Sequence, residues 1–316
     1  MNALRNLFGV LLILGGGALI LFGLFGDENT SEAKSPPPPD TRTVSGEVSL
    51  PSDGTVELTN NEGNIQVRTW ERDAVKYDVT FRATDEAKAV QQATLDVFED
   101  DDRVRLRPDM GDVGKSWSIG VLYVKHNDNI PDVDMRVTVP KTARVNIAHD
   151  DAEVDIEGMN GALQVDTEDG RLAIRNHRGG VDVTADDGDL TLQGVTGAVT
   201  LEVDDADVDA SDMQGPFSLF TDDGDADVSF VAFTGDVVID SDDSDVVLRL
   251  PNGAGFDLAT SFEDDDAELE ADFDLAPFRE TVRDDDDVVN YRGSVHGGGP
   301  QIVLRGREPD VRLVTQ

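Results

Sequence analysis

The sequence predicts an all-β protein whose main part is a β-solenoid, a parallel β-helix-like stack, preceded by one N-terminal transmembrane helix. Three observations carry this prediction: an 18-residue repeat of paired apolar residues, turns rich in aspartate and glycine, and an uncharged apolar run near the N-terminus. A repeat that stays in step favours stacked coils, because a solenoid aligns equivalent side chains from coil to coil and a meander does not need to.

The apolar pairs form two series that lie half a period apart, and the 18-residue step lengthens slightly towards the C-terminus. Polar residues separate the members of each pair, which is the alternation of a strand with one buried face. We therefore expect about seven coils of two short strands, each stacked on its predecessor, with an antiparallel sheet as the structural alternative. The first series is Val145/Ile147, Leu163/Val165, Val181/Val183, Val199/Leu201, Phe217/Leu219, Val237/Ile239 and Phe256/Leu258. The second is Val154/Ile156, Leu172/Ile174, Leu190/Leu192, Val208/Ala210, Ala226/Val228, Val246/Leu248 and Ala267/Leu269.

Each predicted coil has one glycine turn and one acidic turn, because both residue types favour tight reversals of the chain. The glycine turns carry Gly161, Gly180, Gly197, Gly215 and Gly235. The acidic turns carry Asp150-Asp151, Asp169-Gly170, Asp187-Gly188, Asp204-Asp205, Asp223-Gly224 and Asp242-Asp243.

The uncharged run from Leu7 to Phe25 predicts the transmembrane helix. At about 1.5 Å per residue it spans roughly 28 Å, close to the bilayer core. Arg5 precedes the run and Asp27 follows it, so the N-terminus is expected in the cytoplasm and the bulk of the chain in the periplasm or outside the cell. We expect a single-pass anchor over residues 1–26 that binds the cell membrane through residues 7–25. A cleaved signal peptide is the alternative, although no A-x-A site follows the run.

Residues 27–43 read as a Pro-rich linker, since the prolines at 36–39 favour extended polyproline II. Residues 44–140 alternate less regularly, and we expect this region to cap or start the solenoid. Within it, residues 85–94 favour a short helix with Asp85 as its N-terminal cap, and residues 111–129 favour a loop with a short strand.

Residues 141–316 are expected to hold the solenoid repeats and a C-terminal cap. The pairs Ile302/Leu304 and Val311/Leu313 lie half a repeat apart, as the two strands of a coil do, and we expect them to close the last coil.

Composition excludes several classes of function. The formal net charge is −40 and the pI is about 4.1, and no cluster of Lys and Arg appears, so nucleic acid is not an expected partner. The chain has no cysteine, which excludes disulfides, thiolate metal sites and cysteine nucleophiles.

The chemistry-bearing residues do not form the asymmetric set that an enzyme needs. The carboxylates repeat identically, and the histidines His126, His149, His177 and His296 show no metal-binding spacing. We therefore expect no catalytic residue and no enzyme activity. A polysaccharide-active enzyme with paired carboxylates in a solenoid groove remains the alternative, because such pairs have no sequence motif.

Calcium is the one cofactor that the acidic turns suggest, since stacked aspartates can supply the oxygen ligands that hard cations take. Neither the nine-residue calcium-solenoid motif nor an EF-hand loop occurs, so a solvated acidic ladder is the favoured reading over a specific site. Two carboxylates about 4.8 Å apart repel by roughly 0.9 kcal/mol in water, and molar salt screens this repulsion, which suggests a halophilic, salt-adapted host. The weak calcium candidates are Asp169, Asp187, Asp189, Asp205, Asp223, Asp225 and Asp243.

Three stretches resemble the DUF4097 putative-adhesin family of bacterial β-strand-repeat proteins. These are GNIQVRTWERDAVKYDV (63–79), VTVPKTARVNIAHDDAEVDIEGMNG (137–161) and the repeat unit GGVDVTADDGDLTLQG (179–194). The resemblance covers residues 44–316 and implies a β-solenoid-like, membrane-associated or exported domain. The turns of this chain are more acidic than the Ser-Gly-Asp turns of the family.

Together these expectations describe a membrane-anchored, extracytoplasmic and non-catalytic solenoid with a structural or adhesion-like role, which contacts a cell-surface glycan or protein. A self-assembling scaffold resembling bactofilins is a further alternative, although the irregular N-terminal region should block one end of such a filament.

Overall fold

The computed structural model describes residues 41–83, 87–111, 117–119, 122–124, 131–281 and 288–316. The predicted anchor, most of the linker and Asp85 lie outside these residues. Among the described residues, no helix is long and apolar enough to cross a membrane.

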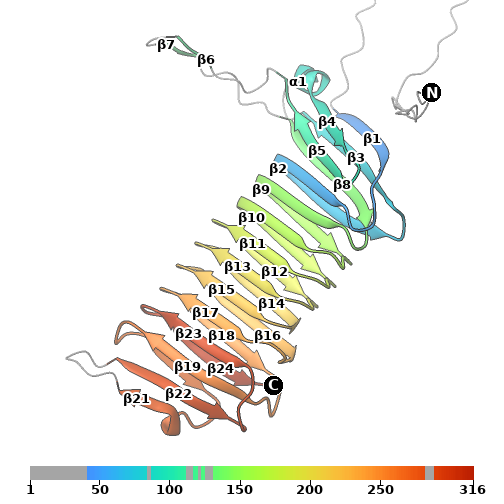
Figure 1. Ribbon diagram of the computed structural model, residues 1–316. Coiled ribbons are helices and arrows are strands. Elements are labelled where there is room, and N and C mark those ends of the chain that lie inside the picture. Colours follow the sequence, from blue (N-terminus) through green and yellow to red (C-terminus); the bar gives the residue numbers. More distant parts are fainter. Residues whose placement is uncertain (1–40, 84–86, 112–116, 120–121, 125–130, 282–287) are drawn as a thin grey trace, which may run out of the picture.

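The described chain is almost entirely β-structure, stacked along one axis (Figure 1). The short helix α1 (Ala87–Gln92) falls inside the helix expected at 85–94. The loop expected at 111–129 contains the two-stranded pair β6 (Trp117–Ile119) and β7 (Leu122–Val124). The strands of the stack are β2 (Thr55–Trp70), β9 (Arg144–Glu157), β10 (Leu163–Arg175), β11 (Val181–Ala185), β12 (Asp189–Gln193), β13 (Val199–Val203), β14 (Asp207–Gln214), β15 (Phe217–Thr221), β16 (Ala226–Ala232), β17 (Val237–Ser241), β18 (Asp245–Leu250), β19 (Phe256–Phe262), β20 (Glu268–Ala271), β23 (Gln301–Gly306) and β24 (Asp310–Thr315).

The 18-residue register predicted from the apolar pairs is present as parallel strand pairing. Leu163 pairs with Val181, Val181 with Val199, and Val199 with Phe217 on the first face of each coil. Leu172, Leu190 and Val208 follow the same rule on the second face. These side chains are buried between the two faces, so the core is one continuous double column of apolar residues. The antiparallel alternative is wrong for the coils.

The glycine turns also stack, but through a different residue than expected in one coil. The column contains Gly179 and not Gly180: a Cβ on Gly179 would lie 2.4 Å from the Gly161 carbonyl oxygen, whereas one on Gly180 would meet nothing within 4 Å. Gly197 and Gly215 continue the column, each against the carbonyl of the glycine before it. Side chains are therefore excluded from this column by the close approach of successive backbones.

Each of four successive coils ends its second strand with a residue in the left-handed region. Gly158, Asn176, Gly194 and Asp212 occupy this position, one repeat apart, with φ between 53° and 78°. Glycine, asparagine and aspartate are the residues that tolerate this conformation best, so the column explains which residue types recur there.

Antiparallel strands close the N-terminal end of the stack. Within the region expected to be irregular, β2 forms a full coil, with Val56 opposite Val145 and Ile65 opposite Val154. One half of β2 pairs with β5 (Arg103–Asp109), which pairs in turn with β4 (Thr94–Glu99). The other half pairs with β8 (Asp132–Pro140), which is followed by β3 (Ala74–Arg82) and β1 (Thr41–Ser49).

The order of the last coils differs from the expected order. The coil of β23 and β24 does not end the stack: β23 pairs with β17 on one side and β19 on the other, and β24 pairs with β18 and β20 (Figure 1). It therefore separates two coils that are consecutive in the chain. The outer side of β19 is instead covered by the antiparallel strands β22 (Val289–Val295) and β21 (Arg279–Thr281), after the short helix η1 (Ala276–Phe278).

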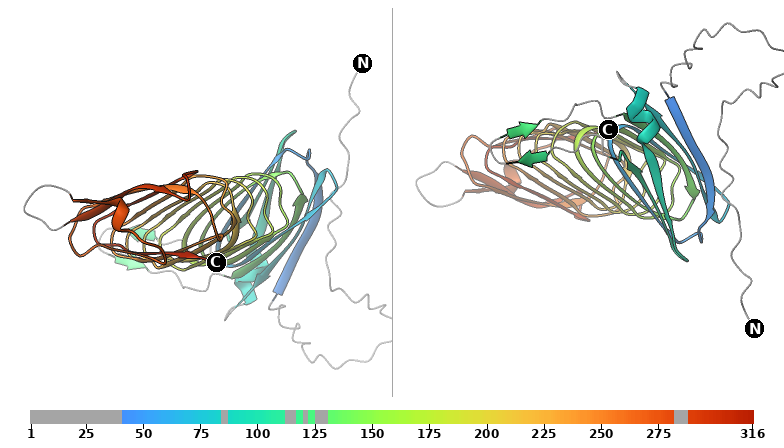
Figure 2. Two further views of the ribbon diagram at one scale, coloured as in Figure 1. Left: turned by 90° about the horizontal axis from the view of Figure 1, so that it is seen from below. Right: turned by 90° about the horizontal axis from the view of Figure 1, so that it is seen from above.

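The stack therefore contains nine coils in the described residues: the seven predicted ones, the β2 coil and the β23–β24 coil. Seen from above and below, the coils form a single row with β1 at one end and the β21–β22 pair at the other (Figure 2).

Candidate functional site

The outward side chains of the second face form the most extended polar surface of the stack. Strand alternation turns Leu190 and Leu192 inward, so that Asp189 and Thr191 point outward. Because each strand pairs with its counterpart one repeat later, the outward residues of successive strands align in columns. The first column runs Glu153, Arg171, Asp189, Asp207, Asp225 and Asp245.

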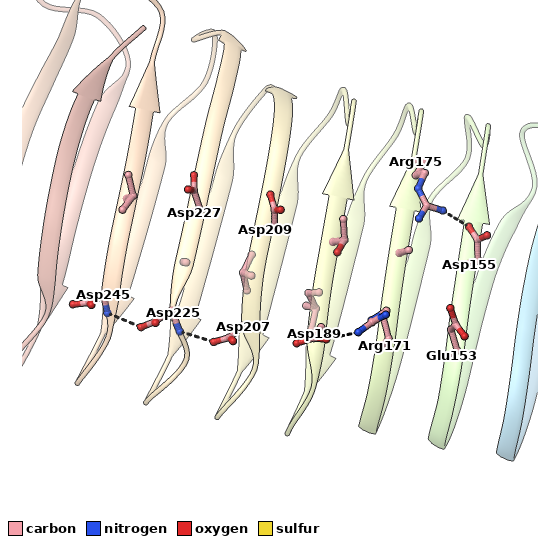
Figure 3. A pocket seen from close by; sticks show the side chains of 16 residues that line it. Glu153, Asp155, Arg171, Arg175, Asp189, Asp207, Asp209, Asp225, Asp227 and Asp245 are labelled. Atoms are coloured by element: carbon pink, nitrogen blue, oxygen red, sulfur yellow. Dashed lines mark hydrogen bonds and ion pairs between the residues drawn. The ribbon is translucent and has the colours of Figure 1, made fainter.

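A second column, two positions further along each strand, adds Asp155, Asp209 and Asp227. The two columns line an open groove of about 620 Å³ that follows the second face from β9 to β18. We call this groove the acidic face. Its carboxylates are Glu153, Asp155, Asp189, Asp207, Asp209, Asp225, Asp227 and Asp245 (Figure 3).

Arginines neutralise the β9–β10 end of the acidic face. Arg171 pairs with Asp189 at 2.9 Å, and the resulting hydrogen bond raises the pKa of Arg171. Asp155 lies between Arg175 at 2.8 Å and Arg68 at 2.9 Å. These pairs are partly or largely exposed, so each contributes little to stability on its own.

In the middle of the acidic face the carboxylates bind the backbone of the next coil. The Asp225 amide donates to Asp207 Oδ1 at 3.2 Å, and the Asp245 amide donates to Asp225 Oδ1 at 3.1 Å (Figure 3). Each aspartate therefore accepts a hydrogen bond from the amide at the start of the following coil. This local bond gives the column a structural use that does not depend on a ligand.

Asp207 is a residue of this site that the calcium candidates omit. It stands one repeat from both Asp189 and Asp225, so the repeat itself was a sufficient signal to find it. Asp245 continues the same column after a 20-residue step.

The structure separates the seven calcium candidates into two groups. Asp189 and Asp225 belong to the acidic face, whereas the other five stack in the acidic turns, where amides donate to carbonyls of the coil before, as from Asp205 to Asp186. All seven are exposed. The turn group is Asp169, Asp187, Asp205, Asp223 and Asp243.

Only one group of three acidic side chains comes within metal-binding distance of one another in the described part of the chain. It is Asp264, Asp265 and Asp266, whose ligand atoms lie within 4.8 Å, and it contains none of the seven candidates. The Asp266 amide holds the pKa of Asp264 below its ordinary value, and the hydrogen bond to Asp264 raises the pKa of Asp265. A run of exposed aspartates in one turn accounts for this arrangement without a metal.

His149 and His177 are buried in separate columns, as their separation in the sequence suggests. The His149 ring lies beside Thr167, with 3.2 Å between Nδ1 and Oγ1, and burial lowers its pKa against the opposing charges of three nearby aspartates. His177 is fully buried among apolar turn residues, and burial lowers its pKa while the backbone of Gly180 and Gly161 opposes that shift. Neither ring lines the acidic face.

Comparison with protein families identifies the fold. The model of the family described as Toastrack DUF4097 matches residues 54–294. The chain belongs to this family. The match begins one residue before β2, so it includes the first coil, and it ends within β22. The resemblance drawn from the sequence is thus confirmed.

Solved structures similar to this Toastrack chain are distant. A putative cell adhesion protein from Clostridium sporogenes is 9% identical, with 87% of this chain and 100% of that chain covered and a TM-score of 0.27. A putative adhesin from Bacteroides fragilis is 11% identical, with coverages of 87% and 97% and a TM-score of 0.31. A putative lipid binding protein from Parabacteroides distasonis is 9% identical, with coverages of 87% and 96% and a TM-score of 0.32. No curated protein matches the chain.

Proposed function

We propose that this Toastrack chain is a membrane-anchored, extracytoplasmic and non-catalytic solenoid that contacts a cell-surface glycan or protein through its acidic face. The observation that carries the proposal is the acidic face itself: eight carboxylates spread along six consecutive coils, presented outward in one open groove. A long surface of one charge suits an extended partner with cationic or hydrogen-bond-donating groups, because successive coils offer the same contact again.

The repeated geometry supports contact rather than catalysis. A general acid and a general base need different surroundings to perform different roles, whereas Asp207 and Asp225 each accept the same backbone bond from the next coil. The groove is also open along its length, so it does not shield a reacting bond from water.

A glycan array combined with a hydrolysis screen tests this function. We expect retention of a glycan or protein ligand without turnover. Release of new reducing ends would instead support the polysaccharide-active alternative.

Charge-matched variants show whether the acidic face makes the contact. The triple variant Asp207→Asn, Asp209→Asn and Asp225→Asn removes three charges from the face but keeps a side-chain oxygen to accept the backbone amides. Its control removes three exposed charges from the first face, through Asp166→Asn, Asp182→Asn and Glu202→Gln. We expect at least a tenfold loss of affinity only in the first variant. Equal losses would show that net charge, and not this face, governs binding.

We further propose that residues 7–25 anchor the chain in the cell membrane, with residues 27–43 as a spacer and the solenoid outside the cytoplasm. The apolar run and its flanking charges support this topology. Alkaline extraction should leave the protein in the membrane fraction, and protease added to spheroplasts should degrade the solenoid. A soluble protein whose N-terminus lies beyond residue 26 would show a cleaved signal peptide instead.

The ends of the stack disfavour a bactofilin-like filament. End-to-end growth requires an open parallel edge at each end. In the described residues, the β1–β3–β8 and β4–β5 strands cover the N-terminal end, and β22 with β21 covers β19 at the other. Electron microscopy of the full protein should therefore show single rods without filaments.

A further inference from the structure

The coil of residues 301–315, which we call the inserted coil, fills a slot between two coils that are consecutive in the chain. Its strands are hydrogen-bonded on both edges, to β17 and β18 on one side and to β19 and β20 on the other. The side chains of Ile302, Leu304 and Leu313 are fully buried. The inserted coil is therefore as deeply packed as the centre of the stack.

The two coils that border the slot carry patterns that match each other directly. Val237/Ile239 and Phe256/Leu258 are separated by nearly one repeat, which is within the range of steps between coils that do stack. The slot between them is thus not dictated by the local repeat. It exists because a separate segment occupies it.

The turn that leads into the inserted coil is tight. His296, Gly297 and Gly298 are three successive residues in the left-handed region, with φ of 49°, 92° and 79°. This turn crosses the start of β19: His296 Nδ1 lies 3.1 Å from the Ala254 carbonyl oxygen, and a Cβ on Gly299 would lie 2.3 Å from the Gly255 carbonyl oxygen. Left-handed residues and close backbone crossings are unfavourable features that an open turn would not need.

We propose that the inserted coil exchanges between two copies of this chain, so that residues 301–315 of each copy fill the slot of the other. The partner's segment is identical, so it restores every strand pairing and every buried contact within the slot. Only the turn at 296–300 changes, and exchange relieves its crossing over residues 254–256. Exchange of an identical element is a low-cost route to a dimer, because the two forms differ mainly in the hinge.

A mixed-label experiment on the full chain in detergent solution tests this proposal. The chain has no cysteine, so one introduced cysteine gives one labelled site. Pyrene is placed on Ser261→Cys in one preparation and on Arg305→Cys in another, because these exposed residues are register partners on neighbouring strands. The two preparations are unfolded together, refolded at high concentration, and separated by size. We expect a dimer that shows pyrene excimer emission.

A matched label distinguishes exchange from simple association. Thr184→Cys lies in the same outward column of the first face as position 305, but on β11, which does not exchange. Pyrene at 184 mixed with pyrene at 261 should give no excimer. Refolding that yields no dimer, or a dimer with equal excimer emission from both mixtures, would overturn the proposal.

The hinge gives a second, independent readout. Gly299→Ala places a Cβ against the Gly255 carbonyl only in the closed turn, so we expect the dimer fraction to rise several-fold. Gly180→Ala is the control, because a Cβ there meets nothing within 4 Å. An unchanged dimer fraction in Gly299→Ala would contradict the proposed hinge.

Discussion

At the residue scale, Gly179 and Gly180 are neighbours in the chain with opposite surroundings. Gly179 has φ of 139° and faces the Gly161 carbonyl, whereas Gly180 is exposed and open. Spacing alone could not decide between them, since either glycine fits the repeat. The choice depends on how closely two backbones approach, which is a property of the stacked structure.

This difference predicts opposite effects of the same substitution. We expect Gly179→Ala to lower the free energy of unfolding by about 2 kcal/mol or more, through backbone strain and a steric clash. Gly180→Ala should be neutral or stabilising by up to about 1 kcal/mol, because alanine restricts the unfolded chain. Urea unfolding of both variants measures this. Equal effects would show that Gly179 does not lie in the stacked column.

His177 shares its column with Met159, Val195 and Met213, so an apolar side chain fits its position. Burial lowers the pKa of His177 in the folded protein, and the unfolded chain therefore binds the proton more tightly below about pH 6.5. The stability that the neutral ring allows is complete above that pH and is lost as the pH falls from about 6.5 towards the lower folded-state pKa.

His177→Met should remove this component. Between about pH 7.5 and 5.5 we expect the variant to lose less stability than the unsubstituted protein, while the component from His149 persists in both. Chemical denaturation at the two pH values provides the measurement. An identical loss in both proteins would mean that His177 does not resist protonation in the folded state.

At the scale of elements, the repeat predicted each coil but not the position of every coil. The pairs Ile302/Leu304 and Val311/Leu313 have the spacing of one coil, which indicates that a coil exists. Its neighbours β17 and β19 are chosen by pairing at free strand edges, and the separation of Val237 from Ile302 in the chain is no multiple of the repeat. Long-range order of this kind has no local signal.

The acidic face was predictable to a similar extent. The recurrence of aspartate was visible, and so was the step that relates Asp189, Asp207 and Asp225. The bonds from their carboxylates to the next coil were not, because they require the two strands to be placed side by side.

The order of the last coils can be tested by two leucine truncations. Leu313 on β24 is fully buried inside the stack, whereas Leu269 on β20 lies in the last coil of the second face and is 7% exposed. We expect Leu313→Ala to cost about 2–5 kcal/mol and Leu269→Ala clearly less, since the outer site can relax. Stacking in chain order predicts the reverse ranking, so equilibrium unfolding of the two variants separates the arrangements.

At the scale of the whole molecule, the net charge of −40 is carried by a stack whose acidic side chains recur in columns. Neighbouring coils in a sheet are about 4.8 Å apart, and like charges at that spacing repel in dilute buffer. The arginine pairs on the acidic face neutralise only its β9–β10 end and the Asp227 carboxylate, which pairs with Arg249. Collective repulsion along the columns is therefore a property of the assembled coils and not of one site.

Thermal melting of the full protein in dilute buffer, in 1 M KCl and in millimolar CaCl₂ with an ionic-strength-matched control tests this collective behaviour most directly. Molar salt shortens the screening length to about 3 Å, so we expect Tm to rise by roughly 5 °C or more in KCl. Calcium should give no more stabilisation than its matched control. Equal Tm values in all conditions would contradict the collective ladder, and stabilisation by calcium far beyond the control would show specific cation sites instead.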